Sequence, residues 1–134
     1  RKSDPYMSNN IILFRLSDMI LLQAEVALYQ DKLGDAADII NKFRLRNHSS
    51  SAELTAGDGK SAIMYQYMIE RGRELYLEGQ LYWDLIRTRM YLKFIPWLSD
   101  SRFKNEGFYW PITPTLFKDN GNLTQTKYWR GRIK

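Results

Sequence analysis

Residues 63–89 read IMYQYMIERGRELYLEGQLYWDLIRTR and carry the strongest pattern in the chain. One set of side chains in this stretch recurs at intervals of three and four residues, as on one face of an α-helix: Met64, Met68, Arg71, Leu75, Glu78, Tyr82 and Leu85. The spacing predicts a helical region over residues 61–89, with Arg71 and Glu78 on an otherwise apolar face. Gly79 predicts a kink or break in it, because glycine costs about 1 kcal/mol against alanine in a helix interior.

Charged residues of both signs lie close together along this helical region: Glu70, Arg71, Arg73, Glu74, Glu78, Asp84 and Arg87. A general acid needs a carboxyl group with a raised pKa, whereas neighbouring arginines lower the pKa of a carboxyl group. We therefore interpret these seven residues as a structural ion-pair network between helices. Because Arg71 and Glu78 fall on the apolar face, we expect both to be buried and paired with charges on other segments.

A second helical pattern precedes this region. From Leu16 to Ala27, apolar and small side chains again recur at helical spacing. Gly34 is expected to end this helix in a left-handed conformation, and Asp35 to cap the next one. The two helices would form an αα-hairpin similar to a tetratricopeptide unit. The predicted fold class is therefore all-α, built on tetratricopeptide-like helix pairs.

The C-terminal third has a different composition. Residues 91–117 are rich in aromatic side chains and contain Pro96, Pro111 and Pro114, which predicts irregular structure. Trp83 is expected in the core of the helical part. Three further tryptophans lie in loop-like sequence, where a ring can stack on a sugar or fill a gap in the core: Trp97, Trp110 and Trp129. These three are the candidate ligand-binding residues.

Composition excludes several kinds of site. The chain of 134 residues has no cysteine and one histidine, His48, so we expect no disulfide, no metal site and no cofactor. His48 stands beside serines, but a serine triad needs a strained turn and an orienting group that this loop lacks. The net charge of +5 comes from scattered residues, which favours a solvated surface over a nucleic-acid site.

No membrane-spanning run and no signal peptide are recognisable in the sequence. The chain opens abruptly on Arg1-Lys2-Ser3, so residues 1–134 are expected to be a fragment of a longer protein, with any export signal upstream.

Four blocks, in order, resemble the SusD/RagB family of surface nutrient-binding lipoproteins of Bacteroidota. They are residues 15–25 (RLSDMILLQAE), 40–46 (INKFRLR), 70–87 (ERGRELYLEGQLYWDLIR) and 111–125 (PITPTLFKDNGNLTQ). The resemblance implies an all-α protein held outside the outer membrane by an N-terminal lipid. Such proteins bind glycans or other nutrients, cap a SusC-like TonB-dependent transporter, and are not enzymes. Residues 1–134 resemble the C-terminal portion, to which no family binding residue is carried over.

Two alternatives remain beside this interpretation. One is a helical-repeat scaffold that binds another protein, which the αα-hairpin supports. The other is a nucleic-acid binder, suggested only by the positive charge.

Overall fold

The structure is a computed structural model that describes residues 13–133, and no β-strand occurs within them, which confirms the all-α prediction. The helices are α1 (Leu16–Tyr29), α2 (Leu33–Arg46), the 3₁₀-helix η1 (Ala56–Asp58), α3 (Lys60–Glu74), α4 (Gln80–Arg87), α5 (Tyr91–Phe94), α6 (Asp100–Lys104) and α7 (Leu116–Asp119). The chain divides into two compact units, Arg1–Thr88 and Arg89–Lys134. No helix in the described part is both long and apolar enough to cross a bilayer.

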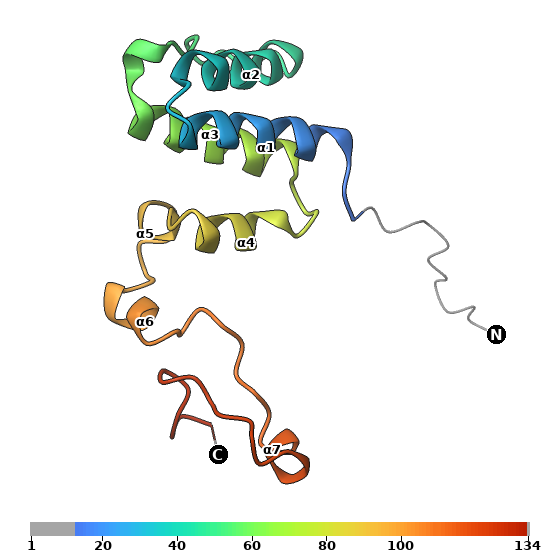
Figure 1. Cartoon of the computed structure of the whole chain (residues 1–134), viewed down its shortest axis with the longest axis vertical. Coiled ribbons are helices and arrows are strands. Elements are labelled where there is room, and N and C mark those ends of the chain that lie inside the picture. Colours follow the sequence, from blue (N-terminus) through green and yellow to red (C-terminus); the bar gives the residue numbers. More distant parts are fainter. Residues whose placement is uncertain (1–12, 134) are drawn as a thin grey trace, which may run out of the picture. The chain divides into compact units, whose positions relative to one another are not determined.

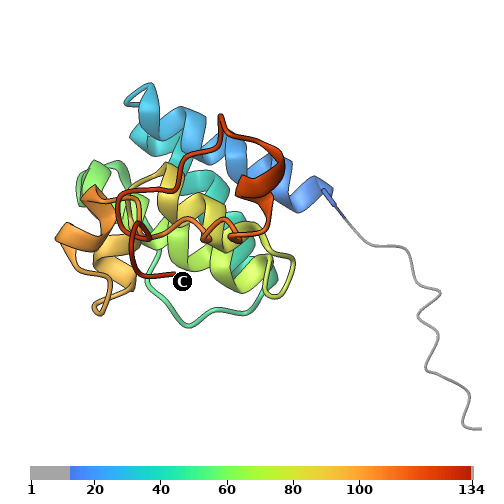
Figure 2. The same cartoon turned by 90° about the horizontal axis from the view of Figure 1, so that it is seen from below.

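The first unit is built on three helices that pack against one another. Figure 1 shows α1 and α2 as a hairpin, one helix above the other, and α3 also packs against both. Figure 2 shows the same helices after a quarter turn. Small and apolar side chains fill the space between them and are fully buried: Leu21, Ala24, Leu28, Ala36, Ile40 and Ile63. Small residues on α1 and α2 let these two helices approach closely.

The turn between α1 and α2 differs from the prediction. Asp31, with φ of 59°, takes the left-handed position, while Gly34 lies in the first turn of α2. The amide of Lys32 donates to the carbonyl of Ala27 at 2.9 Å, the hydrogen bond that closes a Schellman motif. Asp35 is likewise inside the first turn and not at the N-cap, which is Lys32. Aspartate tolerates the left-handed region, so the turn does not need the glycine.

The helical region predicted for residues 61–89 is interrupted. Helix α3 ends at Glu74, and α4 begins at Gln80 after a turn in which Leu77 and Gly79 have φ of 63° and 81°. The predicted break at Gly79 is thus observed, but the turn starts earlier than the glycine. Glu78 lies in this turn, so it does not share a helix face with Arg71, and that part of the prediction is wrong.

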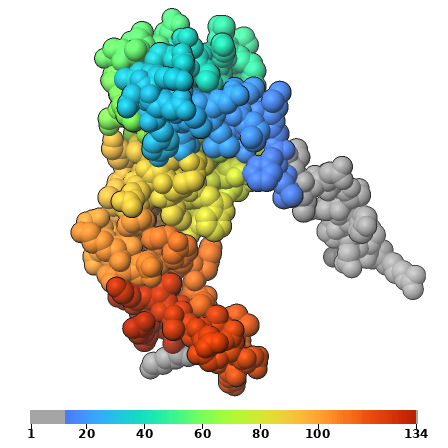
Figure 3. Space-filling view, viewed as in Figure 1, coloured from blue at the N-terminus to red at the C-terminus, as the bar shows by residue number. Residues whose placement is uncertain are grey.

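The second unit contains three short helices and little other regular structure, in line with its prolines. A stack of rings lies at its centre: Tyr91 and Phe103 have centroids 3.8 Å apart, and Phe103 and Phe108 have centroids 4.6 Å apart. In Figure 3 the red C-terminal segment lies directly against the orange segment that contains α6, and the amide of Tyr128 donates to the carbonyl of Asn105 at 2.8 Å.

Candidate functional site

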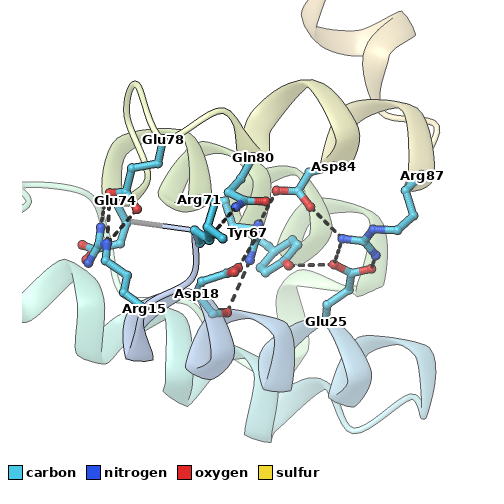
Figure 4. Close-up of polar contacts among 11 residues, drawn as sticks. Arg15, Asp18, Glu25, Tyr67, Arg71, Glu74, Glu78, Gln80, Asp84 and Arg87 are labelled. Atoms are coloured by element: carbon cyan, nitrogen blue, oxygen red, sulfur yellow. Dashed lines mark hydrogen bonds and ion pairs between the residues drawn. The ribbon is translucent and has the colours of Figure 1, made fainter. Parts of the chain in front are cut away.

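Arg71 is the centre of the charged residues of the first unit. Its side chain is 2% exposed, and it extends from α3 towards α1 and α4 (Figure 4). Nε donates to Oδ2 of Asp84 at 2.6 Å, and Nη2 lies 2.8 Å from Oδ1 of Asp18. One buried guanidinium therefore connects three helices through two carboxylates.

Asp84 extends the connection to a second arginine. Nη2 of Arg87 donates to Oδ1 of Asp84 at 2.8 Å and to Oε2 of Glu25 at 2.8 Å. The hydroxyl of Tyr67 donates to the same carboxylate of Glu25 at 2.7 Å. Burial alone would raise the pKa of Glu25, but the hydrogen bonds from Arg87 and Tyr67 outweigh it and lower that pKa. Glu25 is therefore held as a carboxylate between α1, α3 and α4.

A further set of ion pairs surrounds the turn after α3. Nη1 of Arg15 contacts Oε1 of Glu74 at 2.7 Å, and its Nε contacts Oε2 of Glu78 at 2.9 Å. Arg46, at the end of α2, also pairs with Glu74. Burial would raise the pKa of Glu74, yet the hydrogen bonds from Arg46 and Arg15 hold it at about 2.

Glu70 joins α2 to α3. Its Oε1 accepts from Nε of Arg44 at 3.2 Å and from Nη1 of Arg73 at 2.9 Å. Arg44 also donates to the carbonyl of Ala52 at 2.5 Å and to the side chain of Gln66 at 2.6 Å. This arginine therefore holds the loop after α2 against α3.

Each of the seven charged residues singled out in the sequence is placed in an ion pair by the structure. Arg71 is buried, whereas the side chain of Glu78 is 26% exposed. The partners contributed by α1, by its N-cap residue and by α2 were missed: Arg15, Asp18, Glu25, Arg44 and Arg46. Asp18 and Glu25 are seven residues apart, two helical turns, so their shared face of α1 was a signal that could have found them.

The arrangement favours a structural role over proton transfer. The acids of the network face arginine side chains, and hydrogen bonds from these arginines lower the pKa values of Glu25 and Glu74. A carboxyl group that stays ionised cannot act as a general acid near neutral pH. Among residues 13–133 there is also no group of three or more His, Cys, Asp or Glu side chains placed to hold a metal ion.

The three candidate tryptophans all lie in the second unit but differ in environment. Trp97 and Trp110 are 72% and 83% exposed. Trp129 is half-buried, and its Nε1 donates to the carbonyl of Tyr109 at 2.7 Å. Trp97 and Trp129 are brought to one place, because the guanidinium of Arg102 lies 5.4 and 6.0 Å from their ring centroids.

Trp83 is not where the sequence predicted it. It is 58% exposed, with the edge of its ring against Tyr82 at a centroid distance of 5.0 Å. On the short helix α4, the inward positions belong to Asp84 and Leu85, so the preceding residue faces outward.

The chain is similar in sequence to known proteins of one family. The model of the SusD family matches residues 1–129. SusD-like protein P38 of Formosa agariphila is 29% identical over 122 residues, which are 87% of this chain and 24% of that protein. No solved structure matches the chain significantly. Since the family model covers nearly every residue, including all four sequence blocks, the chain belongs to the SusD family.

Proposed function

We propose that the protein to which this chain belongs binds a glycan or other nutrient at the cell surface without altering it. In this proposal it delivers the nutrient to a SusC-like TonB-dependent transporter, and a lipid anchor holds it at the outer membrane. The observation that carries the proposal is the family match over residues 1–129. The chain spans 24% of the length of its curated relative, so the proposal concerns the whole protein.

The two units suit different parts of this function. In the first unit, a rigid ion-pair network joins α1 to α4, as expected of a scaffold. In the second unit, exposed rings of Trp97 and Trp110 are available to stack on a sugar face. Trp129 is the third candidate, and the hydrogen bond from its indole N–H to Tyr109 fixes the orientation of its ring.

A non-enzymatic role is supported by the charge arrangement. SusD-like proteins bind substrates without catalysis, and the lowered pKa values of Glu25 and Glu74 leave these carboxylates without a proton to donate. Glycoside hydrolysis requires one carboxyl group with a raised pKa beside an ionised one.

The second candidate is a helical-repeat scaffold that binds another protein. One observation favours it: the outer face of α1 carries a row of apolar side chains, namely Leu16, Met19, Val26 and Tyr29, that are 53–74% exposed. Such a row is typical of a helix face that meets a partner.

Calorimetry of the full-length protein against a panel of glycans tests the first proposal. We expect heat of binding with at least one glycan and no change in that glycan after prolonged incubation, followed by chromatography. Trp97→Ala, Trp110→Ala and Trp129→Ala would each weaken binding by about fivefold if their rings stack on the ligand, since an aromatic contact contributes about 1 kcal/mol. Product formation would contradict the non-enzymatic role.

Co-purification tests the proposed partner. A SusC-like transporter encoded beside this gene is expected to co-purify with the full-length protein from detergent-solubilised outer membranes. A complex with a soluble protein in its place would favour the helical-repeat scaffold.

A further inference from the structure

Positive charge is concentrated in the second unit. Residues 89–134 contain nine lysines and arginines against three aspartates and glutamates, whereas residues 1–88 contain eleven against twelve. The net positive charge of the whole chain therefore comes from its last third. One of the three acids, Asp100, is already paired with Lys104 at 2.9 Å.

Four of these cations line one open pocket of about 550 Å³. Its walls come from two segments, the one that contains α6 and the one after Thr126. Its lining consists of the four cations Arg102, Lys127, Arg130 and Arg132 together with uncharged polar and aromatic side chains. No carboxylate is among these residues. A pocket of this volume is within the range of small-ligand sites, about 300–1,000 Å³.

Two of the three arginines of this pocket, Arg102 and Arg132, lie against aromatic rings and not against acids. The guanidinium of Arg102 lies 4.9 Å from the ring centroid of Tyr128 and 5.4 Å from that of Trp97, and Arg132 lies 4.4 Å from the ring of Tyr128. Within residues 13–133, no carboxylate forms an ion pair with Arg102, Lys127, Arg130 or Arg132. In the first unit, by contrast, buried arginines such as Arg71 each meet a carboxylate.

The pocket walls are closely packed at one glycine. A Cβ added at Gly107 would lie 2.6 Å from Cγ of Arg102 and 2.7 Å from Cγ of Tyr128, so only glycine permits these two side chains to meet here. Nε of Arg102 donates to the carbonyl of Gly107 at 3.3 Å, and the backbone bond from Tyr128 to Asn105 joins the two walls. Arg102 is therefore positioned by the fold before a ligand arrives.

We propose that this pocket binds an acidic saccharide, with a carboxylate or sulfate ester of the sugar held by the four cations. Guanidinium groups match both anions through paired hydrogen bonds. The exposed ring of Trp97 offers a face for the sugar ring, and Ser99, Ser101 and Asn105 offer partners for its hydroxyls. This inference rests on the proposed nutrient-binding function and specifies the chemical class of the nutrient.

The shape of the site favours a saccharide over a nucleic acid. Binding of single strands uses a basic groove that follows several phosphates, together with a series of rings for successive bases. Here the cations converge on one pocket, beside one highly exposed ring, that of Trp97.

The test is a titration of the 134-residue chain followed by NMR, with four probes: methyl glucoside, methyl glucuronide, glucose 6-sulfate and inorganic sulfate. We expect at least one acidic sugar to bind tenfold or more tightly than methyl glucoside, and inorganic sulfate to bind more weakly than that sugar. Comparison of methyl glucuronide with glucose 6-sulfate identifies which anion the pocket prefers. Binding of the acidic sugars should weaken as salt increases.

Variants locate the site. Lys127→Gln and Arg130→Gln remove exposed cations without touching the ring cluster around Arg102, and each should weaken acidic-sugar binding by threefold or more. Trp97→Ala should weaken sugar binding but leave inorganic sulfate unchanged. Lys118→Gln, an exposed cation of the same unit outside the pocket, and Tyr76→Ala, with 73% exposure, are the matched controls and should change nothing.

Equal affinity for neutral and acidic sugars would overturn the acidic-saccharide inference while leaving the proposed nutrient binding intact. Tighter binding of a single-stranded oligonucleotide, lost in Arg130→Gln, would also overturn it in favour of nucleic acid. If the chain binds none of the sugars, the inference fails, and the glycan panel on the full-length protein decides the proposed function separately.

Discussion

Arg71 shows how one side chain can hold several segments together. It is 2% exposed and contacts Asp18 and Asp84, which lie on different helices. Among the described residues, Asp18 forms its ion pair with this guanidinium, whereas Asp84 also pairs with Arg87. Removing one partner of a buried ion pair leaves an uncompensated charge, which costs about 3–5 kcal/mol.

Arg71→Met is accordingly expected to lower the free energy of unfolding by about 3–5 kcal/mol, measured by urea denaturation followed by circular dichroism. Arg73→Met is the matched control on the same helix. Its side chain is 54% exposed, and its buried partner Glu70 keeps an ion pair with Arg44, so a loss below about 1 kcal/mol is expected. Similar losses in both variants would contradict the role given to Arg71.

A second variant separates the ion pairs from simple packing. Replacing Asp18 and Asp84 by asparagine in the Arg71→Met background removes the stranded charges. Part of the lost stability should return, because the cost comes chiefly from unpaired charge. A further loss of stability would show that packing around Arg71 dominates.

At the scale of elements, the turn between α3 and α4 decides where the acids of the network lie. Leu77 and Gly79 both have positive φ, and Arg15 holds the turn through Glu74 and Glu78. The turn reverses the chain so that Asp84 on α4 meets Arg71 on α3. Without it, a continuous helix would carry Asp84 away from Arg71 by several turns.

Gly79→Ala is expected to destabilise the protein by about 1–2 kcal/mol, because a Cβ is disfavoured at φ of 81°. No atom lies within 4 Å of the added carbon, so the loss would come from the backbone alone. Gly34→Ala is the matched control: it also meets nothing within 4 Å, but it lies in a helix with ordinary φ. Gly34→Ala should raise the free energy of unfolding by about 0.5–1 kcal/mol. The two melting temperatures should therefore move in opposite directions, and a shift in the same direction would contradict the assignment of the turn.

At the scale of the whole chain, the two units differ in how their charged residues are balanced. In the first unit, cations and acids are nearly equal in number and form ion pairs between helices. In the second unit, cations exceed acids and four of them line a pocket. The first arrangement makes stability depend on pH, while the second is available for a ligand.

The free energy of unfolding of the chain should decrease as the pH drops below about 4.5. The pKa of Glu74 is about 2 in the folded protein and about 4.5 in the unfolded chain, so the unfolded state takes up protons first as the pH falls. The contribution of Glu74 is therefore fully present above pH 4.5 and is lost as the pH approaches 2. Glu25 shifts in the same direction.

Urea denaturation of the wild type and of Glu74→Gln at pH 7, 4.5, 3 and 2 checks this expectation. The wild type should be more stable by roughly 1–2 kcal/mol at pH 7, with allowance for solvent around Arg46, and the difference should shrink towards pH 2. A difference that stays constant with pH would contradict the ion pairs of Glu74.

Much of the architecture could be predicted from the local sequence pattern. Apolar spacing predicted α1 and α3, and the ordered blocks identified the family that the comparison then showed. The seven charged residues were also recognisable, because charges on a helix face in the midst of apolar residues need partners. Periodicity records which side of one helix is buried, and for this the sequence of that helix suffices.

Other features depend on contacts between distant segments. The carboxylates that meet Arg71 and Arg87 from α1 lie 53 and 62 residues away, and no spacing within one helix specifies such a pair. The pocket walls likewise meet only because the chain after Thr126 returns to α6. Asp31 takes the left-handed position in place of Gly34 because the capping hydrogen bonds select that position. Trp83 faces outward because Asp84 and Leu85 occupy the inward positions of α4. The sequence by itself determined the helices and the family; only the tertiary structure decided which charges compensate one another and which line a pocket without a carboxylate, since electrostatic energy depends on distance in space and not along the chain.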